Sequence, residues 1–146
     1  MAAIRPLAPL AAFVIMVGCH SPTDNSSMGL AAHRAQWAAR GLTRYAYEYK
    51  LTGFNVSWVN RQIHIVVLNG VVASATDVAT GQPAPGDPAS WPTIDKLFDQ
   101  ASQASANRSL RGIQFDPTFD YPTEIDLAGV PDASGSIFAS ALSLLP

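Results

Sequence analysis

The chain contains runs in which apolar and polar residues alternate with a period of two, the pattern of a half-buried β-strand. Residues 44–51 are the clearest run. Every second side chain there is aromatic or apolar, namely Tyr45, Tyr47, Tyr49 and Leu51. Residues 61–68 alternate in the same way, and Asn69-Gly70 separates them from the β-rich residues 71–78. Because Asn-Gly tolerates the positive φ angles of a type I′ turn, the pattern predicts a strand followed by a β-hairpin.

Two segments have the spacing of amphipathic helices instead. Residues 30–40 are rich in the helix formers alanine and arginine, and Gly41 suits the position after the helix end. The side of this helix predicted to face the sheet contains Leu30, Ala31, Ala35, Trp37 and Ala38. Thr93 is a suitable N-cap for a second helix that ends near Ala106. Its buried side is predicted to contain Ile94, Leu97, Phe98 and Ala101.

Three more strands are predicted after the second helix, at residues 110–116, 121–127 and 136–144. The connection over residues 81–92 contains four prolines, which exclude a helix or a central strand. The order is therefore helix, three strands, helix, three strands. We expect an α+β domain with an antiparallel sheet of about six strands and two helices on one face. Two α-β-β-β halves are one interpretation of this order, although the halves share negligible sequence identity.

The first residues have the pattern of a secretory signal. A short start with one positive charge precedes an apolar run of eleven residues, 7–17, which is too short to span a bilayer. Met16-Val17-Gly18-Cys19 resembles the bacterial lipobox, in which the cysteine thiol is acylated after cleavage in front of it. The alternative is a plain secretory signal with a coincidental cysteine. Cys19 is the only cysteine of the chain, which favours the lipobox interpretation.

This interpretation divides the chain into three parts. Residues 1–18 are predicted to be a lipoprotein signal peptide, 19–28 a flexible tether, and 29–146 a single domain. The resemblance to lipoproteins implies attachment to the bacterial envelope. His20 is not the aspartate that retains such proteins at the inner membrane, so the expected location is the outer membrane, facing the periplasm.

Composition narrows the function only slightly. The 146 residues are 48% hydrophobic and 14% charged, with a net charge of −2. These values exclude a disordered polyelectrolyte and a charge-driven nucleic-acid binder. A single cysteine forms neither an internal disulfide nor a cysteine zinc cluster.

Several short motifs, taken in their order and spacing, resemble the bacterial lipoprotein family catalogued as domain of unknown function 6174. They are Trp37 before Tyr45-Ala46-Tyr47, then Val67-Leu68-Asn69-Gly70-Val71, Thr93-Ile94-Asp95-Lys96-Leu97-Phe98, Phe115-Asp116-Pro117, Tyr121-Pro122-Thr123-Glu124-Ile125 and Asp132. Two features depart from the family. Gly53 and Asn55 stand where many members have a cysteine pair, and Asp120 replaces a glycine before Tyr121-Pro122. The family has no established activity, so the resemblance implies a fold and leaves the function open.

The aromatic residues suggest one candidate binding surface. Tyr45, Tyr47, Tyr49 and Tyr121 are the residues proposed for it, with Trp58 and Trp91 expected nearby. Tyrosine is enriched at binding hot spots, so these rings could form a platform for a peptide, a glycan or a protein. The alternative is that they pack beneath the helices, with their hydroxyls reaching the rim.

The acidic residues suggest a second candidate. Asp116, Asp120, Glu124, Asp126 and Asp132 lie in a region without lysine or arginine. They could bind Ca²⁺ or serve a small hydrolase, but their spacing does not match a calcium loop. Turn formation is the alternative for the aspartates. His33 and His64 are interpreted as structural, and no catalytic or metal-binding motif is found. We therefore expect no cofactor and a non-enzymatic binding module whose partner is an envelope protein or a wall component.

Overall fold

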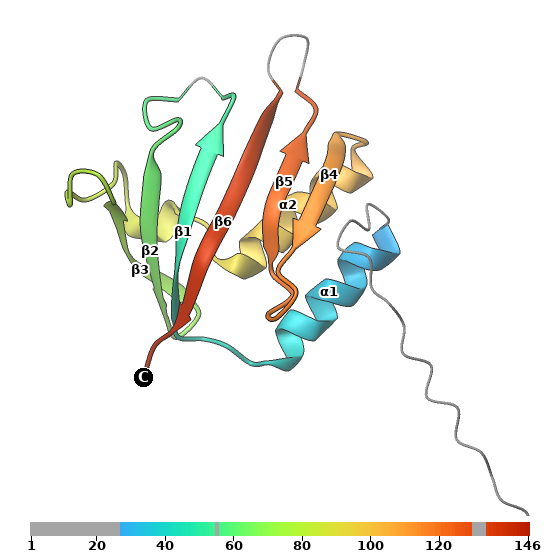
Figure 1. Cartoon of the computed structure of the whole chain (residues 1–146), viewed down its shortest axis with the longest axis horizontal. Coiled ribbons are helices and arrows are strands. Elements are labelled where there is room, and N and C mark those ends of the chain that lie inside the picture. Colours follow the sequence, from blue (N-terminus) through green and yellow to red (C-terminus); the bar gives the residue numbers. More distant parts are fainter. Residues whose placement is uncertain (1–26, 55, 130–133) are drawn as a thin grey trace, which may run out of the picture.

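The computed structural model describes residues 27–54, 56–129 and 134–146. It contains two α-helices, one short 3₁₀ helix and six strands in these parts of the chain (Figure 1). Their order is α1 (Ser27–Ala39), β1 (Tyr45–Thr52), β2 (Gln62–Leu68), β3 (Val71–Asp77), η1 (Pro88–Ser90), α2 (Ile94–Ala106), β4 (Leu110–Phe115), β5 (Pro122–Leu127) and β6 (Gly135–Leu144).

The strands form one antiparallel sheet in the order β3-β2-β1-β6-β5-β4. Each set of three consecutive strands is a meander, and the two meanders join through β1 and β6 at the centre of the sheet. The expected α+β class, the six-stranded antiparallel sheet and the two helices are confirmed. The element order also repeats as α-β-β-β, interrupted only by η1.

Both helices lie on the same face of the sheet, because both contact Phe115 of β4. The His33 ring of α1 stacks on Phe115 at a centroid distance of 3.9 Å, and Phe98 of α2 lies 6.2 Å from it. Trp37 of α1 packs edge-on against Tyr45 at 5.5 Å. These contacts form a continuous core between the sheet and the helices, with the opposite sheet face not covered by either helix (Figure 1).

Helix α1 buries a narrower stripe than the sequence predicts. It begins at Ser27, inside the predicted tether, and buries Leu30 and Trp37, with His33 half-buried between them. Ala31, Ala35 and Ala38, which were expected on the buried side, are exposed. The spacing of three and four residues from Leu30 through His33 to Trp37 is the helical period that the structure uses.

Helix α2 agrees with its prediction. Thr93 is the N-cap, and its hydroxyl accepts a hydrogen bond from the Lys96 amide at 3.3 Å. The four residues predicted to be buried are all inaccessible to solvent: Ile94, Leu97, Phe98 and Ala101.

Local chemistry fixes both ends of β3. Asn69 and Gly70, just before the strand, have φ angles of 53° and 76°, as the predicted type I′ turn requires. At the other end the Asp77 carboxylate is buried and accepts hydrogen bonds from the amides of Ala79 and Thr80. Arg61 from the loop before β2 pairs with the same carboxylate. These bonds anchor the start of the proline-rich connection to the sheet.

Several sequence predictions fall on residues that the structure does not describe. They are the signal peptide over 1–18, Cys19, most of the tether, and Asp132. Among the described residues no helix is long and apolar enough to cross a membrane.

Candidate functional site

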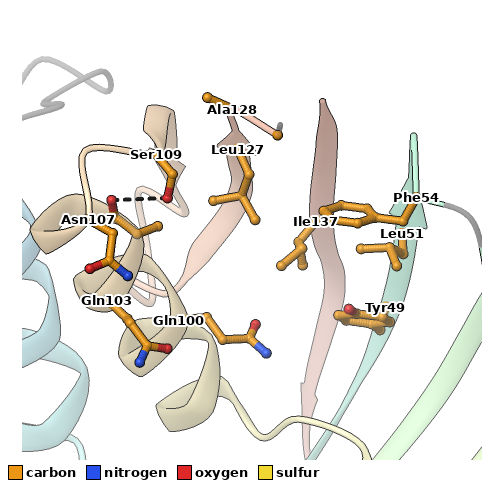
Figure 2. Close-up of a pocket in the computed structure, with 12 residues that line it drawn as sticks. Tyr49, Leu51, Phe54, Gln100, Gln103, Asn107, Ser109, Leu127, Ala128 and Ile137 are labelled. Atoms are coloured by element: carbon orange, nitrogen blue, oxygen red, sulfur yellow. Dashed lines mark hydrogen bonds between the residues drawn. The ribbon is translucent and has the colours of Figure 1, made fainter. Parts of the chain in front are cut away.

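An open groove lies between the C-terminal half of α2 and the neighbouring ends of β1, β5 and β6 (Figure 2). Its cavity volume is about 430 Å³, within the range of small-molecule sites. We call it the α2 groove. It is lined by Tyr49, Leu51, Phe54, Gln100, Gln103, Ala104, Asn107, Ser109, Leu127, Ala128, Gly129 and Ile137.

One wall of the α2 groove is a row of side-chain amides. Gln100, Gln103 and Asn107 are spaced by three and four residues, which places them on one side of the helix. All three are exposed, and Figure 2 shows Gln100 extending from α2 toward the strands. Each amide presents a donor and an acceptor, so this wall can hydrogen-bond polar groups without carrying a charge.

The opposite wall is apolar. Leu51 and Ile137 come from the adjacent strands β1 and β6, where they are register partners, and both are buried. The Phe54 ring, just after β1, is half-buried beside them (Figure 2). Leu127 at the end of β5 completes this wall. The groove is therefore amphipathic, and no charged side chain lines it within the part of the chain that the structure describes.

Gly135 makes room for the Phe54 ring, and Gly53 allows the chain to approach the backbone of Ser134 and Gly135. A Cβ on Gly135 would lie 2.2 Å from the Phe54 ring, and a Cβ on Gly53 would lie 2.2 Å from the Ser134 carbonyl oxygen. Gly53 also has a φ of +79°, which residues with side chains rarely adopt. Sequence reasoning missed this arrangement, because nothing in the local pattern shows that residues 53 and 135 approach each other.

Tyr49 lies at the floor of the groove and differs from its neighbours on β1. No hydrogen bond of its hydroxyl is found within the described chain, and the hydroxyl is not among the buried polar atoms that lack a partner, so it keeps contact with solvent although the residue is only 4% exposed. Burial raises the pKa of Tyr49 to about 12. Trp58 and Trp91 pack against its ring at centroid distances of 6.0 and 5.9 Å. The hydroxyl is thus positioned by packing and available to a ligand.

The other tyrosines of the predicted binding surface serve the core. The Tyr45 hydroxyl accepts a hydrogen bond from the Ile94 amide at 3.1 Å. Tyr47 donates its hydroxyl to the Pro92 carbonyl. Tyr45 and Tyr47 are 0% exposed and Tyr121 is 3% exposed, so these rings form no exposed platform. The structure shows the alternative arrangement, in which the tyrosine face lies beneath the helices. Tyr49 alone among the four borders the groove.

The acidic residues of the C-terminal region are dispersed among separate local interactions. Asp116 accepts hydrogen bonds from the amides of Thr118 and Phe119, as its predicted turn role requires. Glu124 accepts one from the Gln114 amide at 2.6 Å. Asp116 and Glu124 line a wide, open hollow of about 530 Å³ on the uncovered sheet face. Across the described ranges, no group of three or more histidine, cysteine, aspartate or glutamate residues is positioned to hold a metal ion.

Asp120 joins α1 to the turn between β4 and β5. Its carboxylate lies 3.1 Å from Nδ1 of His33 and 3.0 Å from a guanidinium nitrogen of Arg40. Arg40 also donates to the Thr118 carbonyl and lies over the Phe119 ring. Asp120 has a φ of 66°, in the left-handed region that aspartate tolerates better than most residues. His33 is thus structural, as predicted, and His64 is half-buried on the uncovered face.

The fold and the groove define a small α+β protein with one helix-covered sheet face and an open amphipathic groove. Residues 29–136 match the model of a family described as a family of unknown function, DUF6174. This match covers most of the 146 residues, and the chain belongs to that family. No curated protein and no solved structure was found to match the chain.

Proposed function

We propose that this protein is a lipid-anchored protein of the bacterial envelope that acts as a non-enzymatic binding module, with the α2 groove as its binding site. One observation carries the binding role. The groove combines an apolar wall, a wall of amides and an unpaired tyrosine hydroxyl in one open cavity. The described residues of its lining include no carboxylate, thiol or imidazole, which favours binding over acid–base or nucleophilic catalysis.

The proposed location is supported by the N-terminal sequence. An apolar run that is too short to span a bilayer ends at Gly18-Cys19, the point at which lipoprotein signals are cleaved and the cysteine is acylated. Acyl chains contribute about 0.8 kcal/mol per buried CH₂, so two or more chains anchor a protein stably. With His20 following, we propose the outer membrane, with the domain facing the periplasm.

The anchor is tested by Cys19→Ser. Intact mass and metabolic labelling with an alkyne fatty acid are compared between this variant and the unaltered protein, together with membrane fractionation. We expect acylation and membrane association only when Cys19 is present. Unchanged mass and distribution in the variant would show that the protein is not a lipoprotein.

The binding site is tested by photo-crosslinking in the host. A benzophenone amino acid replaces Gln103 in the groove or, as a matched control, Gln36, an exposed glutamine of α1 outside the groove. We expect a discrete adduct of defined mass at position 103 and none at position 36. Absence of an adduct at 103, or the same adducts at both positions, would argue against the groove as the binding site.

A further inference from the structure

The direction of α1 shows where the tether enters the domain. Arg40, just after the helix, and His33, nearly two turns earlier, both contact Asp120 in the turn between β4 and β5. Figure 1 shows that the last turn of α1 lies beside this turn and that the first turn of α1 lies farther along the hairpin, toward the end where β4 starts at Leu110. That is also the end at which α2 stops and the α2 groove opens, beside Asn107.

The tether is short compared with the domain. This step rests on the proposed acylation of Cys19, which leaves residues 20–26 between the lipid and Ser27. Eight residue steps reach at most about 28 Å. A domain of this size has a diameter of about 35 Å, from its expected radius of gyration. The tether therefore keeps the groove end of the domain close to the bilayer surface.

The groove chemistry suits a molecule that the bilayer itself supplies. None of the described side chains that line it is charged, so a charged group buried against them would lose hydration without gaining an ion-pair partner. Phe54 and Leu127 are half-buried and offer apolar surface, whose burial against a hydrocarbon chain is favourable. The amides of Gln103 and Asn107 lie on the facing wall, where ester and hydroxyl groups next to such a chain can be hydrogen-bonded.

We propose that the α2 groove takes up the single acyl chain of a lysophospholipid from the membrane to which the protein is tethered. A single acyl chain suits a cavity of about 430 Å³, and the zwitterionic head group of the lipid stays in water at the open end of the groove. The chain lies against the apolar wall. The glycerol hydroxyl and ester meet the amides of α2.

Intrinsic tryptophan fluorescence gives a direct test. Trp58 and Trp91 pack on Tyr49 at the groove floor, whereas Trp37 packs on Tyr45 and Tyr121 away from it. The probe is lysophosphatidylcholine brominated in mid-chain, because bromine quenches tryptophan only at short range. The full chain has three tryptophans, so we expect saturable quenching of at most about two thirds of the emission. Unbrominated lysophosphatidylcholine is the control for environmental effects.

Two arms separate this proposal from the anchor. In the first, the full-length Cys19→Ser protein is titrated with probe below its micelle concentration. In the second, the acylated protein is reconstituted in phosphatidylcholine vesicles that contain the probe. Quenching in both arms supports the proposal. Quenching in the first arm but not in the second would show that the membrane does not supply the acyl chain. No quenching in the first arm refutes acyl binding, and an acylated Cys19 would then still support the proposed anchor.

Groove variants locate the bound chain. Gln103→Glu places a charge in the groove and should weaken probe binding about ten-fold, whereas the matched change Gln36→Glu on α1 should leave it unchanged. Ala104→Leu fills part of the cavity and should reduce the quenched fraction, provided that circular dichroism shows native helix content. Equal binding by both glutamate variants and by Ala104→Leu would place the lipid elsewhere. A polypeptide adduct from crosslinking at position 103, in place of a lipid adduct, would also overturn the proposal.

Discussion

Replacing Tyr45 with phenylalanine removes one oxygen atom from the core and leaves one amide of α2 without its partner. The Tyr45 ring is inaccessible to solvent, and its hydroxyl accepts the Ile94 amide at 3.1 Å. Ile94 is the first residue of α2, and the first amides of a helix have no partner within the helix. A buried amide that loses its only partner costs about 1–3 kcal/mol. We therefore expect Tyr45→Phe to lower the free energy of unfolding by that amount.

Tyr49→Phe is the matched control for this prediction. Both tyrosines lie on the same face of β1, and both rings are buried in aromatic surroundings. The Tyr49 hydroxyl has no hydrogen-bond partner in the described structure, so its removal should change the free energy of unfolding by less than about 0.5 kcal/mol. The difference between the variants then reports the hydrogen bond alone.

Urea unfolding followed by circular dichroism measures both variants, and thermal unfolding gives an independent value. For a domain of this size, each kcal/mol lowers Tm by roughly 4 °C, so Tyr45→Phe should lower it by about 4–12 °C. Equal losses in the two variants would show that the tyrosine hydroxyls act through packing or solvation. A loss below about 0.5 kcal/mol for Tyr45→Phe would show that water satisfies the Ile94 amide.

Burial raises the pKa of Tyr47 well above its usual value. The stability that the neutral Tyr47 side chain contributes is therefore complete below about pH 10 and is lost as the pH rises further. Tyrosinate absorbance should increase together with unfolding, and a Tyr47 titration that precedes unfolding would contradict the prediction. Burial alone would raise the pKa of Asp77, but hydrogen bonds and Arg61 lower it overall. The stability that the Asp77 carboxylate contributes is therefore present above about pH 4 and is lost as the pH falls. In Asp77→Asn the free energy of unfolding, measured with urea, should depend less steeply on pH in this acid range. An unchanged pH dependence would show that Asp77 does not cause it. In urea unfolding, Gly53→Ala should destabilise the fold more than Gly81→Ala. Both glycines have a positive φ, but only a Cβ on residue 53 would meet backbone atoms, those of Ser134 and Gly135. Equal losses of stability would refute the close approach of residue 53 to that backbone.

Short-range pattern predicts most of this fold. The hairpin at Asn69-Gly70 and the N-cap Thr93 depend on residues within one turn of each other, and both predictions are confirmed. The α1 face depends on tertiary contacts. Alanine is compatible with both a buried and an exposed helix position, so the alanines of α1 do not show which side of the helix faces the sheet. That side is set by the stacking of the His33 ring on Phe115, which lies 82 residues away in the sequence.

The candidate site was less predictable than the fold for a related reason. Gln100, Gln103 and Asn107 read as the solvent side of an amphipathic helix, which they are. They become one wall of a groove only because the end of β1 and the start of β6 face them across the end of α2. The tyrosine pattern was informative about the strand and its buried face. It carried no information on which hydroxyl would lack a partner.

The two halves of the sheet explain why the groove lies where it does. Both helices contact the second meander through Phe115, whereas the first meander is covered by the connection that carries Trp91 and by the loop that carries Trp58. Helix α2 starts against Tyr45, at one end of β1, and stops before it covers the other end of that strand. The uncovered strand ends supply the apolar wall, and the last turns of α2 supply the amides. A groove at this position therefore follows from one helix covering a sheet whose central strands extend beyond it. Extending α2 by one turn, with four apolar residues inserted after Ala106, would close the groove and, by the same reasoning, abolish ligand binding.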